Sequence, residues 1–249
     1  MNTTKLALAG LVALALSVSA RATDIPVTVD SSTGYNTGDL LVGFYSASAS
    51  NDLIFDLGQA SNFTGLTPGS YNVAAFNASD LTTAALGTGG LWAVGGTDSN
   101  SSSLWTTAQI GTKLKATAAQ AAESGNIEAV GLEVGGTLGT SGLVSPAGVL
   151  LASKSFKAAI GSQNNWSGTF SASVAQSTTG TTSLELWSLP ATGSSSGVAG
   201  IDLGTLTLDA SAGTLTFSVI PEPSTYAAIL GALTIGFVAF RRRFSKAIV

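Results

Sequence analysis

Residues 205–219 read TLTLDASAGTLTFSV, and this stretch sets the fold class. On both sides of the segment DASAG at 209–213, apolar side chains alternate with threonine or serine. Alternation with period two puts the apolar side chains on one face of a strand and the hydroxyl groups on the other. Asp, Ser and Gly between the two runs are typical of a turn. The stretch therefore predicts an antiparallel hairpin with one buried face.

Seven further short apolar runs, most of them alternating, predict more strands. They lie at 40–46, 53–57, 71–76, 91–94, 127–134, 169–174 and 183–189. Clusters of Gly, Ser, Asn and Asp separate them, which indicates a mainly β domain of the antiparallel β-sandwich or jelly-roll-like class. The stretches 110–124 and 149–160 predict one or two short helices, which we expect at the ends of the sandwich.

The placement of charge excludes one class of partner. Between residues 23 and 220 there are thirteen acidic residues and four lysines, a net charge of −9, and every arginine lies outside this region. Such a surface repels the phosphates of nucleic acids. We therefore expect no nucleic-acid partner. Apolar residues recur throughout the same region, so we expect one folded domain at 23–219.

Cysteine and histidine are both absent from the chain. Their absence excludes thiolate nucleophiles, disulfides, histidine-based acid–base catalysis and the common zinc ligand sets. Asp52 and Asp56 could form the carboxylate pair of a glycosidase, because residues of equal parity share one face of a strand. A turn role is the better interpretation of Asp56, which stands beside Gly58 at a strand end. We expect no enzymatic activity, no catalytic residue, no metal and no cofactor.

Residues 1–22 have the organisation of a secretory signal peptide. Lys5 supplies a positive charge, and an apolar run follows at 6–16. The spacing of small residues places cleavage after Ala20 or Ala22. The alternative is a membrane anchor, but a helix of this length is much shorter than the hydrocarbon core of about 30 Å. The segment predicts export through the Sec translocon.

The other end of the chain combines three features in order: a Pro-Glu-Pro segment, an uncharged apolar run at 226–240 and a cluster of arginines. The prolines hold the chain extended and accessible to a protease, and the arginines stay on the cytoplasmic side of a membrane. The apolar run makes a helix of about 22 Å, which suits a transient stop better than a permanent anchor. The motif residues are Pro221, Glu222, Pro223, Ser224, Thr225, Arg241, Arg242 and Arg243.

Together, residues 220–249 resemble the PEP-CTERM sorting domain of Gram-negative bacteria. The resemblance implies an exported protein, first held in the inner membrane through the C-terminal helix and then processed at 221–225 by exosortase, a membrane-embedded enzyme. It further implies a final location in the cell envelope, at the cell surface or in the extracellular matrix, with an association with biofilm and exopolysaccharide. The segments 38–44 and 56–60 are also similar to mature regions of such proteins, which implies no chemistry. A single-pass anchored envelope protein is the alternative.

Four tryptophans raise a second function, carbohydrate binding. Aromatic rings stack on sugars, but in most proteins they lie in the core. Trp166 is the candidate for stacking, because polar residues at 163–165 surround it. The leading expectation is a structural or interaction protein of the surface or matrix. The alternative is a carbohydrate-binding β-sandwich module, with exopolysaccharide as the candidate partner.

Overall fold

The computed structural model describes residues 23–25, 36–46, 53–82, 89–98, 103–116, 127, 130, 175–190, 197–219 and 230–237. Ten strands within these ranges form one sheet. They are β1 (Thr23–Asp24), β2 (Asp39–Tyr45), β3 (Leu53–Gln59), β4 (Gly69–Ala75), β5 (Leu91–Asp98), β6 (Ser103–Gln109), β7 (Gln176–Ser177), β8 (Thr181–Pro190), β9 (Ile201–Asp209) and β10 (Thr214–Val219). Two 3-10 turns, η1 (Ala60–Phe63) and η2 (Ala78–Leu81), flank β4.

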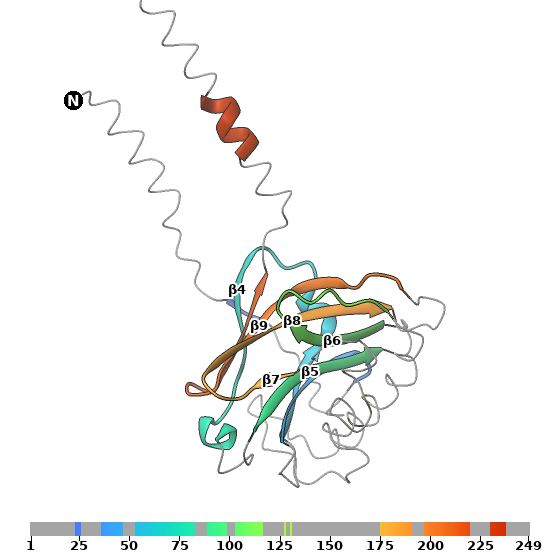
Figure 1. Ribbon diagram of the computed structural model, residues 1–249, viewed down its shortest axis with the longest axis vertical. Helices are drawn as coiled ribbons and strands as arrows, with labels where there is room; N and C mark the ends of the chain where they lie inside the picture. The colour runs from blue at the N-terminus through green and yellow to red at the C-terminus, as the bar shows by residue number, and fades with distance from the viewer. Residues whose placement is uncertain are drawn as a thin grey trace, which may run out of the picture.

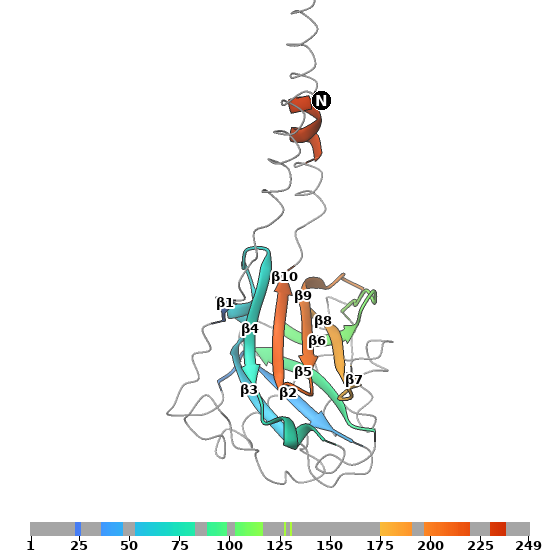
Figure 2. The ribbon, with the colours of Figure 1, turned by 90° about the vertical axis from the view of Figure 1, so that its left-hand side faces the viewer.

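The strand order is β1-β4-β10-β9-β8-β6-β5-β2-β3, with β7 paired to β5. Every pairing is antiparallel except that of β1 with β4. The prediction of a mainly β, antiparallel fold is therefore confirmed. In Figure 2, β4, β10 and β9 stand side by side in front of β5 and β2, so the sheet folds over into two layers. Among the described strands these layers are not two separate sheets, because β8 pairs with both β6 and β9.

The hairpin at 205–219 is confirmed in detail. Leu208 lies opposite Leu215, and Leu206 lies opposite Phe217. All four side chains are fully buried, while the alternating hydroxyl residues are only partly covered. The apolar face packs into a core cluster shared by β2, β3, β4, β5, β8, β9 and β10. The hydrophobic effect on alternating residues thus orients both strands.

The sheet curls because its ladders are interrupted. Register shifts occur in the β2–β3, β8–β9 and β10–β4 pairs. Such bulges increase the local twist and bend of a strand. The two ends of the sheet then approach, and the ring of Phe76, after β4, lies 4.7 Å from Phe55 of β3 and 5.1 Å from Phe44 of β2. Side chains rather than backbone hydrogen bonds make this contact.

The layer containing β2 is covered on both faces, which the alternation of the hairpin did not predict. All seven residues of β2 are buried. Leu40 belongs to the core cluster, whereas Leu41 points to the opposite face and is also fully buried. Ile127 and Val130 are helical and fully buried as well. The prediction of a strand at 127–134 is therefore wrong at these two residues.

The strands predicted at 40–46, 53–57, 71–76, 91–94 and 183–189 are confirmed, as β2, β3, β4, β5 and β8. Other predictions are wrong or fall outside the described residues. The helix expected at 110–124 is wrong at 110–116, where a turn leads into a bridge between Lys115 and Ala199. Strand β6 is not among the predicted strands, because its sequence SLWTTAQ does not alternate cleanly. The helix expected at 149–160 and the strand expected at 169–174 lie outside the described residues.

Candidate functional site

The residues predicted for export, sorting and glycan stacking all lie outside the described ranges. They are Ala20, Ala22, Trp166, Pro221, Glu222, Pro223, Ser224, Thr225, Arg241, Arg242 and Arg243. The described chain does show what adjoins them. Strand β1 begins at Thr23, directly after Ala22, and β10 ends at Val219, two residues before Pro221.

Residues 230–237 of the predicted apolar run are helical (Figure 1, red). Thr234 turns its hydroxyl back to the carbonyl of Leu230, at 2.7 Å. The large apolar side chains of this segment stand in solvent, with 63–72% of each exposed: Leu230, Leu233, Ile235 and Phe237. Within the described residues, no helix has the length and apolarity needed to span a membrane.

The described tryptophans are placed for packing. Trp92 is fully buried, and its indole N–H donates to the hydroxyl of Thr182 at 2.9 Å. Trp187 is 7% exposed, and Trp105 packs against the core cluster. Trp92 and Trp187 are therefore too deeply buried to stack on a sugar, whereas Trp105 is partly exposed. Trp166, the candidate from the sequence, lies outside the described residues.

A buried pair of carboxyl groups is the unusual polar feature of the sheet. A tight turn precedes β2: the Asp39 N–H donates to the carbonyl of Asn36, and the Asn36 N–H donates to Asp39 Oδ2 at 2.6 Å. In β3, the Gly58 N–H donates to Asp56 Oδ1 at 2.7 Å. The bulge in the β2–β3 ladder lies between these residues, and Gln59, opposite Asp39, donates its side-chain amide to Asp39 Oδ1.

Both aspartates are sequestered from water. Asp39 is 2% exposed and Asp56 is 5% exposed. Burial raises the pKa of Asp56 to about 7, and the negative charge of Asp39 adds to this rise, while the hydrogen bond from Gly58 opposes it. Burial also raises the pKa of Asp39, against hydrogen bonds from Asn36 and Gln59 that lower it. Each carboxyl group therefore favours its neutral form more than a solvated aspartate does.

This pair can hold a proton, but a substrate would have to displace the strands that bury it. The sequence singles out Asp56 and suggests Asp52 as its partner. Asp52 lies outside the described residues, and the partner that the structure brings to Asp56 is Asp39. Only the register of the β2–β3 ladder reveals this partner, and register is not legible in either strand alone.

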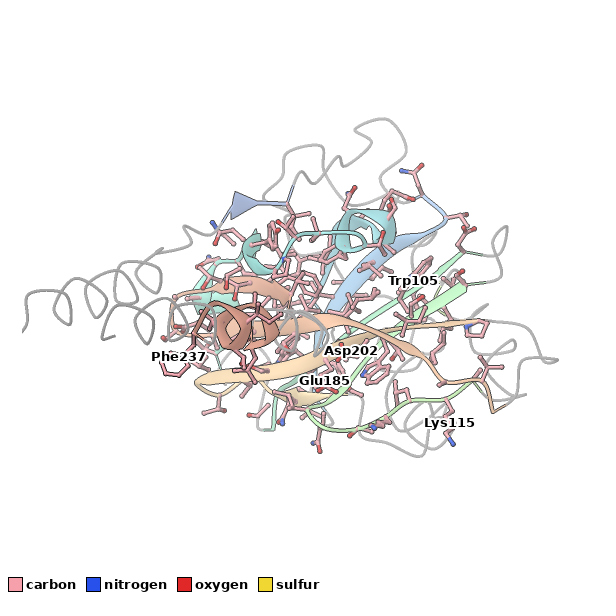
Figure 3. All side chains as sticks on the ribbon, turned by 90° about the horizontal axis from the view of Figure 1, so that it is seen from above. Trp105, Lys115, Glu185, Asp202 and Phe237 are labelled. Carbon is pink, nitrogen blue, oxygen red and sulfur yellow. The ribbon has the colours of Figure 1, made fainter. Side chains whose placement is uncertain are left out.

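An open groove of about 590 Å³ lies between the loop at 63–68 and the first residues of β9. Asp202 is its charged residue, and the Gly204 N–H donates to Asp202 Oδ1 at 2.9 Å. Partial burial raises the pKa of Asp202; that hydrogen bond opposes the rise, and the charge of Glu185 on the neighbouring strand reinforces it (Figure 3). The rest of the lining is largely apolar, including Ile201 and Leu203.

Comparisons of the chain with models of protein families, with curated proteins and with solved structures find no match. Within the described ranges, no three or more Asp and Glu side chains gather in a way that could hold a metal ion.

Proposed function

We propose that this chain is an exported structural or interaction protein of the bacterial surface or extracellular matrix, whose C-terminal tail is a sorting signal removed by an exosortase-type membrane enzyme. In this proposal the mature part is the curled antiparallel sheet within residues 23–219. The precursor is held in the inner membrane by the helix at 226–240. Exopolysaccharide of the matrix is the proposed partner after release.

The observation that carries the proposal is the boundary of the core. The core cluster runs from Ile25 to Phe217, so every buried residue assigned to it precedes the Pro-Glu-Pro segment. The last strand ends at Val219 with its full ladder to β9 already formed. A cut after residue 220 would therefore remove no core side chain and no strand pairing that the described residues make. A removable tail requires this separation.

The exposed apolar helix at 230–237 also supports the proposal. Its apolar side chains at 230–237 make no part of the core cluster, and burying each of them in an apolar phase is worth roughly 1.5–3 kcal/mol. A membrane supplies that phase. An ordinary anchor would use the same side chains, so the fate of the tail separates the two functions.

The test is the mature C-terminus, read by mass spectrometry of protein collected from outside the cells. We expect a product that ends within or near 221–225 and lacks residues 241–249. Recovery of the cell-associated protein with its arginines intact would instead identify a permanent anchor.

A variant tests the motif itself. Combined Pro221→Ala and Glu222→Ala should leave an uncleaved precursor in the membrane fraction. Pro68→Ala is the matched control, because it removes an exposed proline from the domain and should be processed like the wild type. Unchanged release of the double variant would reject the motif assignment.

A further inference from the structure

The buried carboxyl pair has one oxygen without a donor. Asp56 Oδ2 is inaccessible to water and has no hydrogen-bond donor among the described residues. Leaving a buried polar atom unpaired is costly, and two buried like charges add to that cost. The two carboxyl groups are close enough to hydrogen-bond to each other once one of them carries a proton. A single proton therefore supplies the missing donor and removes the repulsion.

Within the part of the chain that the structure describes, no cation lies beside the pair to compensate its charge. From β5, Gly96 and Thr97 lie against the start of β2 and do not titrate, and Asp98 is the next acidic residue along that strand. The turn at 36–38 and η1 contain no titratable side chain. The basic residues of the described ranges, Lys113 and Lys115, contribute to the pKa of neither aspartate. A shared proton is thus the compensation that the described residues allow.

We propose that Asp39 and Asp56 bind one shared proton in the folded domain, and that loss of this proton loosens the junction of the 36–39 turn, the end of β3 and η1. This device belongs to the domain and does not depend on the fate of the tail.

The junction is small and well defined. The Gly38 N–H donates to the carbonyl of Thr97 at 2.8 Å, and the Ala60 N–H donates to the carbonyl of Gly38 at 2.9 Å. These two bonds attach the turn to β5 and to η1. The 3-10 turn ends at Phe63, whose ring packs 5.3 Å from that of Phe217. Phe63 and the loop that follows it to Pro68 form one wall of the groove beside Asp202. Loosening of η1 would therefore also loosen this wall.

The direction of the effect follows from linkage. The folded pKa of Asp56 lies above the ordinary value of 3.8, so the folded state binds more protons than the unfolded chain between pH 3.8 and about 7. The stability that the pair retains at acidic pH is lost as the pH rises through this window. The junction should therefore be tight in mildly acidic surroundings and looser in alkaline ones.

The test is hydrogen exchange of the full-length protein in mild detergent at pH 5.5 and pH 8.5, corrected for intrinsic rates and read by mass spectrometry. Peptides covering 38–46 and 58–66 should lose protection by roughly 30-fold at pH 8.5, if the opened segment ionises like a solvated aspartate. A peptide from the β9–β10 hairpin is the internal control and should not respond. Equal protection of the junction at both pH values would overturn the proposal.

A variant and a direct titration complete the test. Asp56→Asn supplies a permanent amide donor, so its junction should exchange equally at both pH values, while Asp209→Asn, on the exposed hairpin turn, should keep the wild-type response. A full pH response in Asp56→Asn would contradict the mechanism. Should Asp56→Asn fail to fold, the carboxyl carbon shifts of the wild type give the answer. Two ordinary aspartate titrations at 39 and 56 would exclude a shared proton.

Discussion

Gly213 offers a sharp test of how the central hairpin meets the rest of the sheet. It lies in the turn between β9 and β10 with a φ of +66°, and its carbonyl accepts a hydrogen bond from the Phe76 N–H at 2.5 Å. A Cβ built on Gly213 would overlap the carbonyl oxygen of Phe76 and approach the nitrogen of Ala78 to 3.1 Å. Gly213→Ala should therefore suffer both from backbone strain and from a forced separation of the turn from β4.

Gly180 is the matched control. It has a φ of +73°, and a Cβ there would meet nothing within 4 Å. Gly180→Ala should cost about 1 kcal/mol, the usual penalty of the left-handed region for an L-residue. Gly213→Ala adds the displacement of a packed backbone, for which overpacking costs of about 1–3 kcal/mol are typical. We expect a total of about 3 kcal/mol for Gly213→Ala.

Urea unfolding of both variants, followed by tryptophan fluorescence, measures the difference. The slope of the unfolding free energy against urea should stay constant, which would show that the change lies in the folded state. Equal costs for the two variants would refute the reasoning, because the close approach to Phe76 would then have no energetic effect.

The remaining predictions concern single polar contacts. Thr182→Val should cost about 1–3 kcal/mol in unfolding free energy, because it leaves the buried Trp92 N–H without an acceptor. The cost should be smaller in a Trp92→Phe background, which has no N–H to satisfy. Equal costs of Thr182→Val in both backgrounds would show that the hydrogen bond does not contribute to stability. Asp209→Ala should remove part of the acid sensitivity of unfolding. Hydrogen bonds from the Ser211 side chain and the Ala212 backbone lower the pKa of Asp209, so its stabilisation is present above pH 3.8 and is lost as the pH falls through the lower folded value. Unchanged acid denaturation of this variant would contradict that account. Asp56→Asn should instead remove a loss of stability that occurs as the pH rises. This loss is on the order of 4 kcal/mol in unfolding free energy between pH 3.8 and about 7, and urea unfolding across the range measures it. An unfolding free energy that falls with pH as steeply as in the wild type would count against this prediction.

The strands are predictable where only one face is buried. In β9 and β10, buried and partly exposed residues alternate, and the same alternation of apolar and hydroxyl residues is legible in the sequence. In β6, Thr106 and Thr107 are both fully buried, because the layer around β2 is covered on both sides. Because neighbouring threonines on both faces of β6 are buried, apolar and polar residues do not alternate along this strand. The sequence pattern therefore does not reveal β6.

Of the two aspartates in the candidate site, only Asp56 could be singled out from the sequence. Asp56 stands out because of its place beside Gly58, yet its interpretation as a turn residue omits its burial next to Asp39. The two aspartates are separated by a strand, a loop and a bulge. A shift of one residue in the register would send Asp39 to the other face of β2. No local pattern carries that information.

Local chemistry thus accounts for the strand-forming segments, the hairpin at 205–219, and the lack of cysteine and histidine chemistry, since each depends on side-chain type and spacing along the chain. Long-range packing accounts for the single curled sheet, the contact of Phe76 with Phe44 and Phe55, and the meeting of Asp39 with Asp56. The physical reason is that bulges and strand order fix which faces oppose each other, and both arise from the collective burial of apolar side chains from β2 to β10.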